Sequence, residues 1–196
     1  LDYIIKLKEL VPNEINTFES EYILPGGKGI NVSIILKRLD VESVTLGFIS
    51  GFTGKEIQKL VEKEKIQTDF INLEEGHSRI NVKILEDEKE TAINSKGPLV
   101  DNKSIEKLYQ KLNNLKENDI LVLSGSIPKG IKEDIYEEIC EKIKDKNVKI
   151  VVDSTKNLLL NTLKYDPFLI KPNKEELEEI FNTKIIDKEQ ALQYAE

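Results

Sequence analysis

Short apolar runs alternate with amphipathic segments along most of the chain. Residues 43–48, 120–123, 148–152 and 168–170 are apolar runs of strand length, and the segments between them repeat apolar residues at helical spacing. This alternation predicts an α/β fold with a mostly parallel, Rossmann-like sheet and helices on both faces. The helix stripes expected to face the core are Val32, Ile35, Leu36 and Leu39; Ile57, Leu60 and Val61; Ile105, Leu108, Tyr109 and Leu112; and Leu177, Ile180 and Phe181.

Two further segments depart from this alternation. Residues 15–24 and 78–84 alternate apolar with polar positions, and residues 90–93 can return as a hairpin partner after the charged turn at 86–89. They predict a small separate sheet. A flap of two to four strands without a helix cannot bury both faces, so it should cover a ligand or pair with another subunit.

A glycine-rich turn at residues 25–29, Pro-Gly-Gly-Lys-Gly, leads directly into the first amphipathic helix. Glycines leave backbone amides unshielded, and the first amides of a helix have no internal partner, so this junction suits a phosphate or another anion. The alternative is a plain glycine-rich turn that only links a strand to a helix.

Three later helix starts carry a capping-box pattern, in which a short polar residue is followed three positions later by Glu or Gln. The pairs are Thr53 with Glu56, Asn173 with Glu176, and Asp187 with Gln190.

Composition narrows the class of protein. With 39% hydrophobic and 33% charged residues, the 196-residue chain can bury a core and contains no apolar run of membrane-spanning length. A net charge of −7 argues against broad nucleic-acid binding. The single cysteine, Cys140, lies among helical isoleucines and is expected to be a buried hydrophobe. One cysteine forms no intramolecular disulfide, which favours a cytoplasmic location.

The two ends suggest a longer parent chain. The sequence begins at Leu1 without a methionine, and it stops at Glu196 within a helical pattern whose apolar face has nothing after it to cover it. We therefore expect these residues to be the N-terminal and central part of a longer protein.

Five motifs occur in order along the chain: Gly-Gly-Lys-Gly-Ile-Asn-Val-Ser at 26–33, Gly-Phe-Ile-Ser-Gly-Phe-Thr-Gly at 47–54, Ser-Arg-Ile-Asn at 78–81, Ser-Gly-Ser-Ile-Pro at 124–128 and Lys-Pro-Asn-Lys-Glu-Glu at 171–176. Together they resemble the ribokinase-like, or phosphofructokinase B, family of carbohydrate kinases, and most closely its 1-phosphofructokinases, followed by its tagatose-6-phosphate kinases. The resemblance implies a ribokinase-like three-layer sandwich with a β-strand lid, in which residues 1–196 form part of one kinase domain and lid strands near 15–24 and 78–94 are inserted in the core.

The resemblance also implies an activity. The expected reaction is ATP-dependent phosphorylation of a ketohexose monophosphate, with fructose 1-phosphate converted to fructose 1,6-bisphosphate, and tagatose 6-phosphate is the alternative acceptor. ATP and Mg²⁺ would be required. In this family the lid commonly forms a homodimer interface.

The acceptor site implied by the family combines hydroxyl-binding and phosphate-binding groups. Asp2, at the expected end of the first strand, would accept hydrogen bonds from sugar hydroxyls, and Lys28 and Arg79 would meet the substrate's phosphate. From the residues alone, Asp2 is an ordinary strand-end aspartate and Arg79 a solvated strand arginine. The full set of substrate-binding positions is Asp2, Gly26, Gly27, Lys28, Asn31, Arg79, Ser124 and Ser126.

The nucleotide side carries fewer residues. The resemblance places Asp153, Asn173 and Glu176 near the nucleotide phosphates, with Glu176 helping to arrange Mg²⁺ and its waters indirectly. The capping box of Asn173 with Glu176 is by itself a sufficient local explanation. The single histidine, His77, is expected to be a surface turn residue.

One family motif does not occur in these residues. The Gly-Ala-Gly-Asp motif, whose aspartate deprotonates the acceptor hydroxyl in the family, is not in the sequence, and we expect it to lie beyond Glu196. No catalytic residue is therefore assigned within the chain. The 196 residues expressed alone are expected to have no kinase activity.

Two other classes of function are weighed against the kinase. A dinucleotide-dependent dehydrogenase would place its glycines after the first strand of a βαβ unit, whereas here they follow a flap strand and carry Lys28. A non-catalytic sugar-phosphate-binding module stays open, because the acceptor residues are present and the catalytic base is not.

Overall fold

The computed structural model describes residues 1–195. Glu196, the last residue of the sequence, lies outside the described residues.

The described residues form two compact units. The first unit consists of Leu1–Leu108 and Pro128–Gly130, and the second of Tyr109–Ile127 and the chain from Ile131 onward. Helix α3 (Asn102–Leu112) contains the boundary between them. Parallel strands connected by helices occur in both units, which confirms the predicted α/β class.

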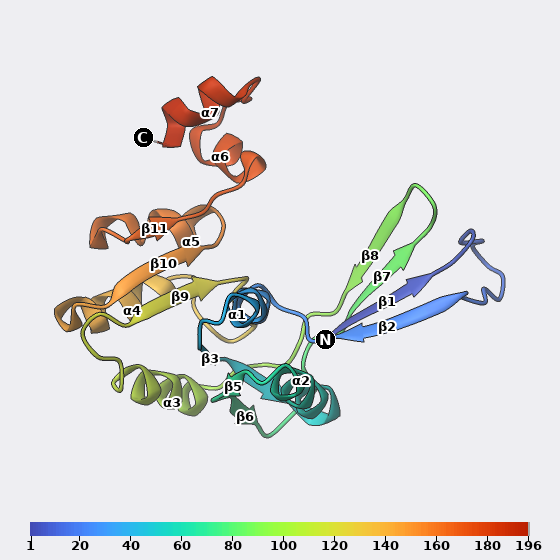
Figure 1. Ribbon diagram of the computed structural model, residues 1–196, viewed down its shortest axis with the longest axis horizontal. Helices are drawn as coiled ribbons and strands as arrows, with labels where there is room; N and C mark the ends of the chain where they lie inside the picture. The colour runs from blue at the N-terminus through green and yellow to red at the C-terminus, as the bar shows by residue number, and fades with distance from the viewer. Residues whose placement is uncertain (196) are drawn as a thin grey trace. The chain divides into compact units, whose positions relative to one another are not determined.

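The lid in the first unit is a four-stranded sheet (Figure 1). Its strand order is β2-β1-β7-β8, and β1 pairs parallel with β7 and antiparallel with β2, while β7 and β8 form the hairpin. The flap is thus confirmed, but it also includes the first strand of the chain. The strands are β1 (Asp2–Lys6), β2 (Ser20–Leu24), β7 (Asn81–Leu85) and β8 (Glu90–Asn94).

Two strand boundaries in the lid differ from prediction. Residues 15–19 lie outside β2, and residues 78–80 precede β7. The hairpin turns where the charged run predicted it, since the Glu86 amide donates to the Lys89 carbonyl at 2.9 Å. Lys83 and Glu90 form an ion pair at 3.1 Å on the same hairpin.

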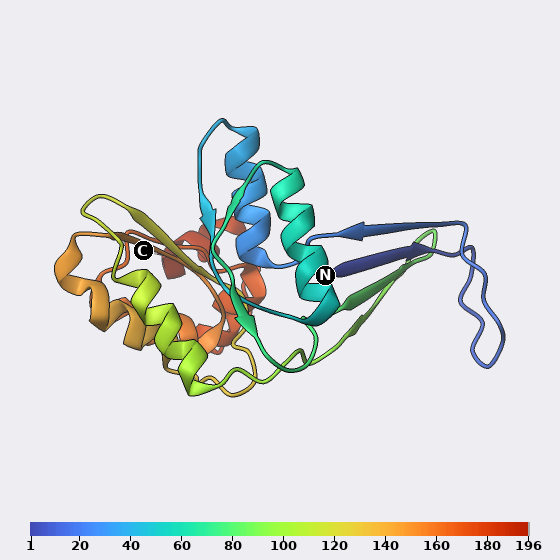
Figure 2. The same ribbon diagram turned by 90° about the horizontal axis from the view of Figure 1, so that it is seen from below.

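The rest of the first unit contains two short parallel pairs, β3 (Val44–Thr45) with β5 (Gln67–Thr68) and β4 (Phe48–Ser50) with β6 (Ile71–Leu73). The single strand predicted over residues 43–48 is therefore two strands. Helices α1 (Lys28–Arg38) and α2 (Gly51–Lys63) lie side by side beside these pairs (Figure 2).

The packing face of α1 was predicted wrongly. Ile30 and Ile34 pack against the core formed by Ile57, Val61 and Ile66, whereas the expected stripe members Ile35 and Leu39 are 53% and 68% exposed. The helix carries apolar residues on more than one side, so spacing alone could not decide which side faces α2.

The start of α2 also differs from prediction. The N-cap is Ser50, and no side chain caps the helix, so the expected capping box of Thr53 with Glu56 is wrong. Thr53 is instead fully buried, and its hydroxyl donates to the Ser78 carbonyl at 2.9 Å. The threonine joins the helix to the segment that leads into the lid.

The second unit contains a parallel three-stranded sheet with the order β11-β10-β9. Its strands are β9 (Ile120–Ser124), β10 (Lys149–Asp153) and β11 (Leu169–Ile170), which confirms the three apolar runs predicted there. Its other elements are α4 (Ile135–Ile143), α5 (Lys156–Leu160), α6 (Lys174–Phe181), α7 (Lys188–Ala195) and two 3-10 turns, η1 (Lys144–Lys146) and η2 (Leu163–Tyr165).

Helix faces in this unit follow the sequence more closely. Leu112 of α3 is buried, and Cys140 of α4 is fully buried between Ile139 and Ile143 on the inner side of that helix. Burial raises the pKa of the Cys140 thiol to about 11. Cys140 is therefore the buried hydrophobe that its neighbours predicted.

The last two helices begin at the predicted caps. At α6, Asn173 and Glu176 form a complete capping box. At α7, Asp187 accepts the Gln190 amide at 2.8 Å, but the Gln190 side chain accepts from Ile186 rather than from Asp187. No helix within residues 1–195 has the length and apolar character required to cross a membrane.

Candidate functional site

The Asp2 carboxylate lies between two segments that are distant in the sequence. Asp2 is the first residue of β1, not the last as predicted, and its register partner on β7 is Asn81. The Asn81 Nδ2 donates to Asp2 Oδ1 at 2.8 Å. On the other side, a Cβ added at Gly26 would lie 2.1 Å from the same oxygen, so only a glycine leaves room for the carboxylate there.

The first turn of α1 follows this carboxylate directly. Gly27 is the N-cap with φ +126°, a conformation that side-chain-bearing residues rarely adopt, and no side chain caps the helix. Lys28 is the first helical residue, the turn contains no acidic residue, and the exposed Asn31 lies one turn further on. Asp2 and the predicted positions Gly27, Lys28 and Asn31 thus lie in the same unit. The helix dipole and the positive charge of the lysine both favour an anion at this helix start.

Arg79 lies at the base of the lid, in the segment just before β7, rather than on a lid strand. Its backbone is held by buried hydrogen bonds of its neighbour Ser78, whose amide donates to the Ser50 carbonyl and whose hydroxyl accepts from the Ser50 amide, both at 2.9 Å. The Thr53 hydroxyl completes this network. The Arg79 side chain is exposed, two residues from Asn81.

His77 is an exposed residue on the turn before this segment, as predicted. Its ring contacts the edge of Phe52, with 5.2 Å between ring centroids and 61° between planes. A Cβ at Gly51 would lie 2.1 Å from the His77 Nδ1, so the imidazole packs against the start of α2. Both contacts pack the His77 ring against residues at the start of α2.

In the second unit, Ser124 and Asp153 end neighbouring parallel strands. They are register partners on β9 and β10, and the Gly125 amide donates to the Asp153 carbonyl at 3.2 Å. Gly125 has φ +91°, which explains the glycine between the two serines. The exposed Ser126 follows on the same loop. Two predicted groups, the serines and Asp153, therefore meet at the carboxyl edge of one sheet, where ligands of open α/β sheets bind.

Asp153 is almost fully buried and forms an ion pair with Lys171, with 3.1 Å between Nζ and Oδ1. Tyr136 reaches the same edge, where its hydroxyl is 3.4 Å from the Gly125 carbonyl. Burial, and after it the Asp153 charge, raises the pKa of Tyr136 to about 12. The tyrosine is therefore a neutral hydrogen-bond donor at physiological pH.

Asn173 and Glu176 stand at the start of α6, just after β11. The Glu176 Oε2 accepts from the Asn173 amide and the Asn173 Oδ1 accepts from the Glu176 amide, both at 2.8 Å. Within residues 1–195, no group of three or more His, Cys, Asp or Glu side chains is placed to hold a metal ion. The Asp153 carboxylate is paired with Lys171, and one oxygen of the buried Glu176 carboxylate accepts from the Asn173 amide.

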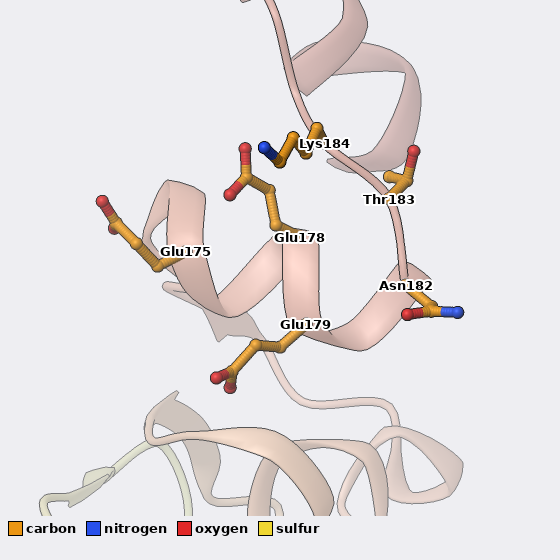
Figure 3. Close-up of a pocket in the computed structure, with 6 residues that line it drawn as sticks. All are labelled: Glu175, Glu178, Glu179, Asn182, Thr183 and Lys184. Carbon is orange, nitrogen blue, oxygen red and sulfur yellow. The ribbon is translucent and has the colours of Figure 1, made fainter.

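A hollow in the same unit lies at the end of α6 (Figure 3). Three glutamates line it beside a single lysine, and Glu178 is already engaged, since its Oε1 accepts from the Ile185 amide at 2.8 Å. Its acidic lining does not suit a phosphate group. The lining residues are Glu175, Glu178, Glu179, Asn182, Thr183 and Lys184.

Two residues of the site were not assigned from the sequence. Asn81 and Lys171 both lie within recognised motifs, yet nothing in the sequence indicated that each contacts an aspartate. The signal that could have found them is strand pairing, because β1 lies parallel to β7 and β10 parallel to β11, which brings the ends of these strands together.

Comparison with known proteins gives one consistent family. The model of the pfkB family of carbohydrate kinases matches residues 1–196. The chain is 40% identical over 194 residues to a 1-phosphofructokinase of Bacillus subtilis, with 99% of this chain and 63% of the relative covered. It is 38% identical to a D-tagatose-1-phosphate kinase of Bacillus licheniformis, covering 94% of this chain and 60% of that protein.

A solved structure from Staphylococcus aureus that carries the name phosphofructokinase is similar in both sequence and fold. It shares 40% identity and a TM-score of 0.82, with 98% of this chain and 62% of that chain covered. The chain thus spans about three fifths of the length of the curated relatives it matches.

Proposed function

The chain belongs to the pfkB family of carbohydrate kinases, and from this premise we propose that the protein containing it uses ATP to phosphorylate a ketohexose monophosphate. Fructose 1-phosphate is the proposed acceptor, because relatives at 40% and 41% identity are named 1-phosphofructokinase. The product would be fructose 1,6-bisphosphate.

The observation that carries this proposal is the Asp2 carboxylate against Gly26, immediately before the glycine and lysine start of α1. A carboxylate accepts hydrogen bonds from two sugar hydroxyls, and the helix start with Lys28 and Arg79 offers positive potential to the phosphate already on the sugar. A plain turn would need neither the close approach of Gly26 nor a carboxylate beside it.

In the proposed reaction, the C6 hydroxyl oxygen of fructose 1-phosphate forms a bond to the γ-phosphorus of ATP. The bond between that phosphorus and the bridging oxygen breaks, ADP leaves, and the hydroxyl proton passes to a base. The resemblance assigns this base to the aspartate of a Gly-Ala-Gly-Asp motif, which is not among these 196 residues and is expected beyond Glu196. Residues described here would bind and orient the acceptor.

The second unit is the proposed nucleotide side. Four residues lie at the carboxyl ends of β10 and β11, namely Asp153, Lys171, Asn173 and Glu176. Ser124 is the last residue of β9, and Ser126 follows that strand. Mg²⁺, when bound, would neutralise charge on the ATP phosphates, with Glu176 helping to hold it or its waters. The family resemblance assigns Ser124 and Ser126 to substrate binding.

The protein is proposed to work in the cytoplasm.

The lid is the proposed homodimer interface. All residues of β8 and most of β2 are exposed, and these edge strands carry the exposed apolar residues Tyr22, Ile23, Leu24 and Ile93. Light scattering of Ile93→Lys beside the wild type tests this proposal. A dimer in the wild type that is lost in the variant supports it, and a monomeric wild type overturns it.

The activity is tested with the complete gene product that contains these residues. ADP release is measured with MgATP and fructose 1-phosphate, tagatose 6-phosphate or no sugar, and NMR identifies the product. Turnover with fructose 1-phosphate at C6 supports the proposal, and preference for tagatose 6-phosphate phosphorylated at C1 would favour the alternative acceptor. Sugar-phosphate binding without ADP release would favour a non-catalytic binding module.

A further inference from the structure

The side chain of Asn81 makes one hydrogen bond to Asp2 and leaves one buried polar atom unpaired. Its Nδ2 donates to Asp2 Oδ1 at 2.8 Å across the parallel β1–β7 pair. Its Oδ1 is buried and has no hydrogen-bond partner among the residues that the structure describes. A buried acceptor without a donor destabilises a fold. An apolar side chain at position 81 would therefore make the lid more stable than asparagine does.

The contact fixes the position of the carboxylate that the proposed function uses. Gly26 blocks one side of Asp2, because its backbone leaves no room for even a Cβ beside Oδ1, and the Asn81 amide holds that same oxygen. The Asn81 amide takes one acceptor position of Oδ1, and the remaining acceptor positions of the carboxylate can receive sugar hydroxyls. Asn81 and Gly26 together restrict the orientation of the Asp2 carboxylate.

We propose that Asn81 is a positioning residue of the acceptor site, which holds the Asp2 carboxylate ready for sugar hydroxyls at the expense of a buried unpaired carbonyl. This inference rests on the proposed function, because it acts through Asp2. It adds a residue whose role is to orient Asp2, not to contact the sugar. The alternative is that Asn81 is a purely structural residue at the start of β7.

The two alternatives predict opposite effects on stability and activity. Asn81→Leu removes both the donor and the buried unpaired acceptor and keeps the number of side-chain heavy atoms. A positioning role predicts an unchanged or raised Tm together with a fall in kcat/KM for fructose 1-phosphate of about tenfold or more. Asn81→Asp, which keeps the shape but places a second carboxylate beside Asp2, should lower kcat/KM at least as much.

A matched control is available on the neighbouring strand. Asn94 on β8 is the register partner of Asn81 and is exposed. Asn94→Leu makes the same substitution in the same strand pair without touching Asp2. It should leave kcat/KM for fructose 1-phosphate unchanged.

A double-mutant cycle with Asp2→Asn in the complete gene product tests whether Asn81 acts through Asp2. In the Asp2→Asn background, Asn81→Leu should lower kcat/KM less than about twofold further. Full additivity, an unchanged kcat/KM in Asn81→Leu, or a large fall in its Tm would each overturn the inference while leaving the proposed function intact. A wild type that neither binds nor phosphorylates any ketohexose phosphate would overturn the proposed function, and this inference with it.

Discussion

A Cβ placed on Gly26 would lie 2.1 Å from the Oδ1 of Asp2 and 2.8 Å from its Oδ2. The atoms in conflict are the tip of a flexible side chain, and Gly26 is not among the glycines with positive φ. Alanine at this position would therefore displace the carboxylate rather than distort the backbone.

The first prediction follows from this geometry. Gly26→Ala should lower kcat/KM for fructose 1-phosphate by about a hundredfold, because an acceptor group displaced by about 1 Å loses its alignment. Its Tm should stay close to that of the wild type. Steady-state kinetics and thermal unfolding of the complete gene product check both values. Unchanged kinetics would show that the Asp2 carboxylate is not used.

The second prediction concerns the buried network below Arg79. Thr53→Val removes the hydroxyl that donates to the Ser78 carbonyl and should lower the free energy of unfolding by about 1–2 kcal/mol in urea denaturation. Thr91→Val on the exposed strand β8 is the matched control and should change that free energy by less than about 0.5 kcal/mol. Equal effects of the two variants would contradict the importance of the network.

The third prediction separates the two roles of Glu176. Glu176→Gln keeps an oxygen that can accept from the Asn173 amide, so the helix cap and the Tm should be retained. If the carboxylate charge helps to hold Mg²⁺, the Mg²⁺ concentration for half-maximal activity should rise about tenfold or more. Glu175→Gln, an exposed neighbour in the same helical turn, is the control and should leave the Mg²⁺ dependence unchanged. The same Mg²⁺ dependence in Glu176→Gln and the wild type would reduce Glu176 to a capping residue.

The fourth prediction is a dependence of stability on alkaline pH. The pKa of Tyr136 is raised to about 12 in the fold by burial and the Asp153 charge, whereas an unfolded tyrosine ionises near 10. The stabilisation by the neutral phenol is complete below about pH 10 and is lost as the pH rises towards 12. At pH 11 this loss lowers the free energy of unfolding by about 1 kcal/mol. Urea unfolding of Tyr136→Phe should lack this component. Identical slopes of stability against pH in both proteins would contradict it.

The lid shows what the sequence could and could not predict. Alternating residues at 78–84 and 90–93 and the charged turn between them indicated a hairpin, and the hairpin is present. The pattern could not show that the first strand joins this sheet, because β1 pairs parallel with β7, about 80 residues away, and such pairing leaves no local signal. The same pairing determines the contact between Asn81 and Asp2.

Helix starts show the limit of local motifs. Asn173 with Glu176 satisfies its capping box completely, since the helix start there is partly exposed and the two side chains can reach both amides. Thr53 has the same spacing to Glu56 but lies inside α2, where a tertiary contact with Ser78 uses its hydroxyl. The place of the helix start separates the two cases, because α2 begins at Gly51 with Ser50 as its N-cap, whereas Asn173 is the N-cap of α6.

Calorimetric titration of fructose 1-phosphate into the complete gene product, without nucleotide, tests the central claim most directly. The claim is that Asp2, Gly26 and the start of α1 form a sugar-phosphate site. The wild type should bind fructose 1-phosphate, Asp2→Asn should bind it about tenfold more weakly or worse, and NAD should give no signal. Binding of NAD without binding of any sugar phosphate, or equal affinity of the wild type and Asp2→Asn for fructose 1-phosphate, would contradict it.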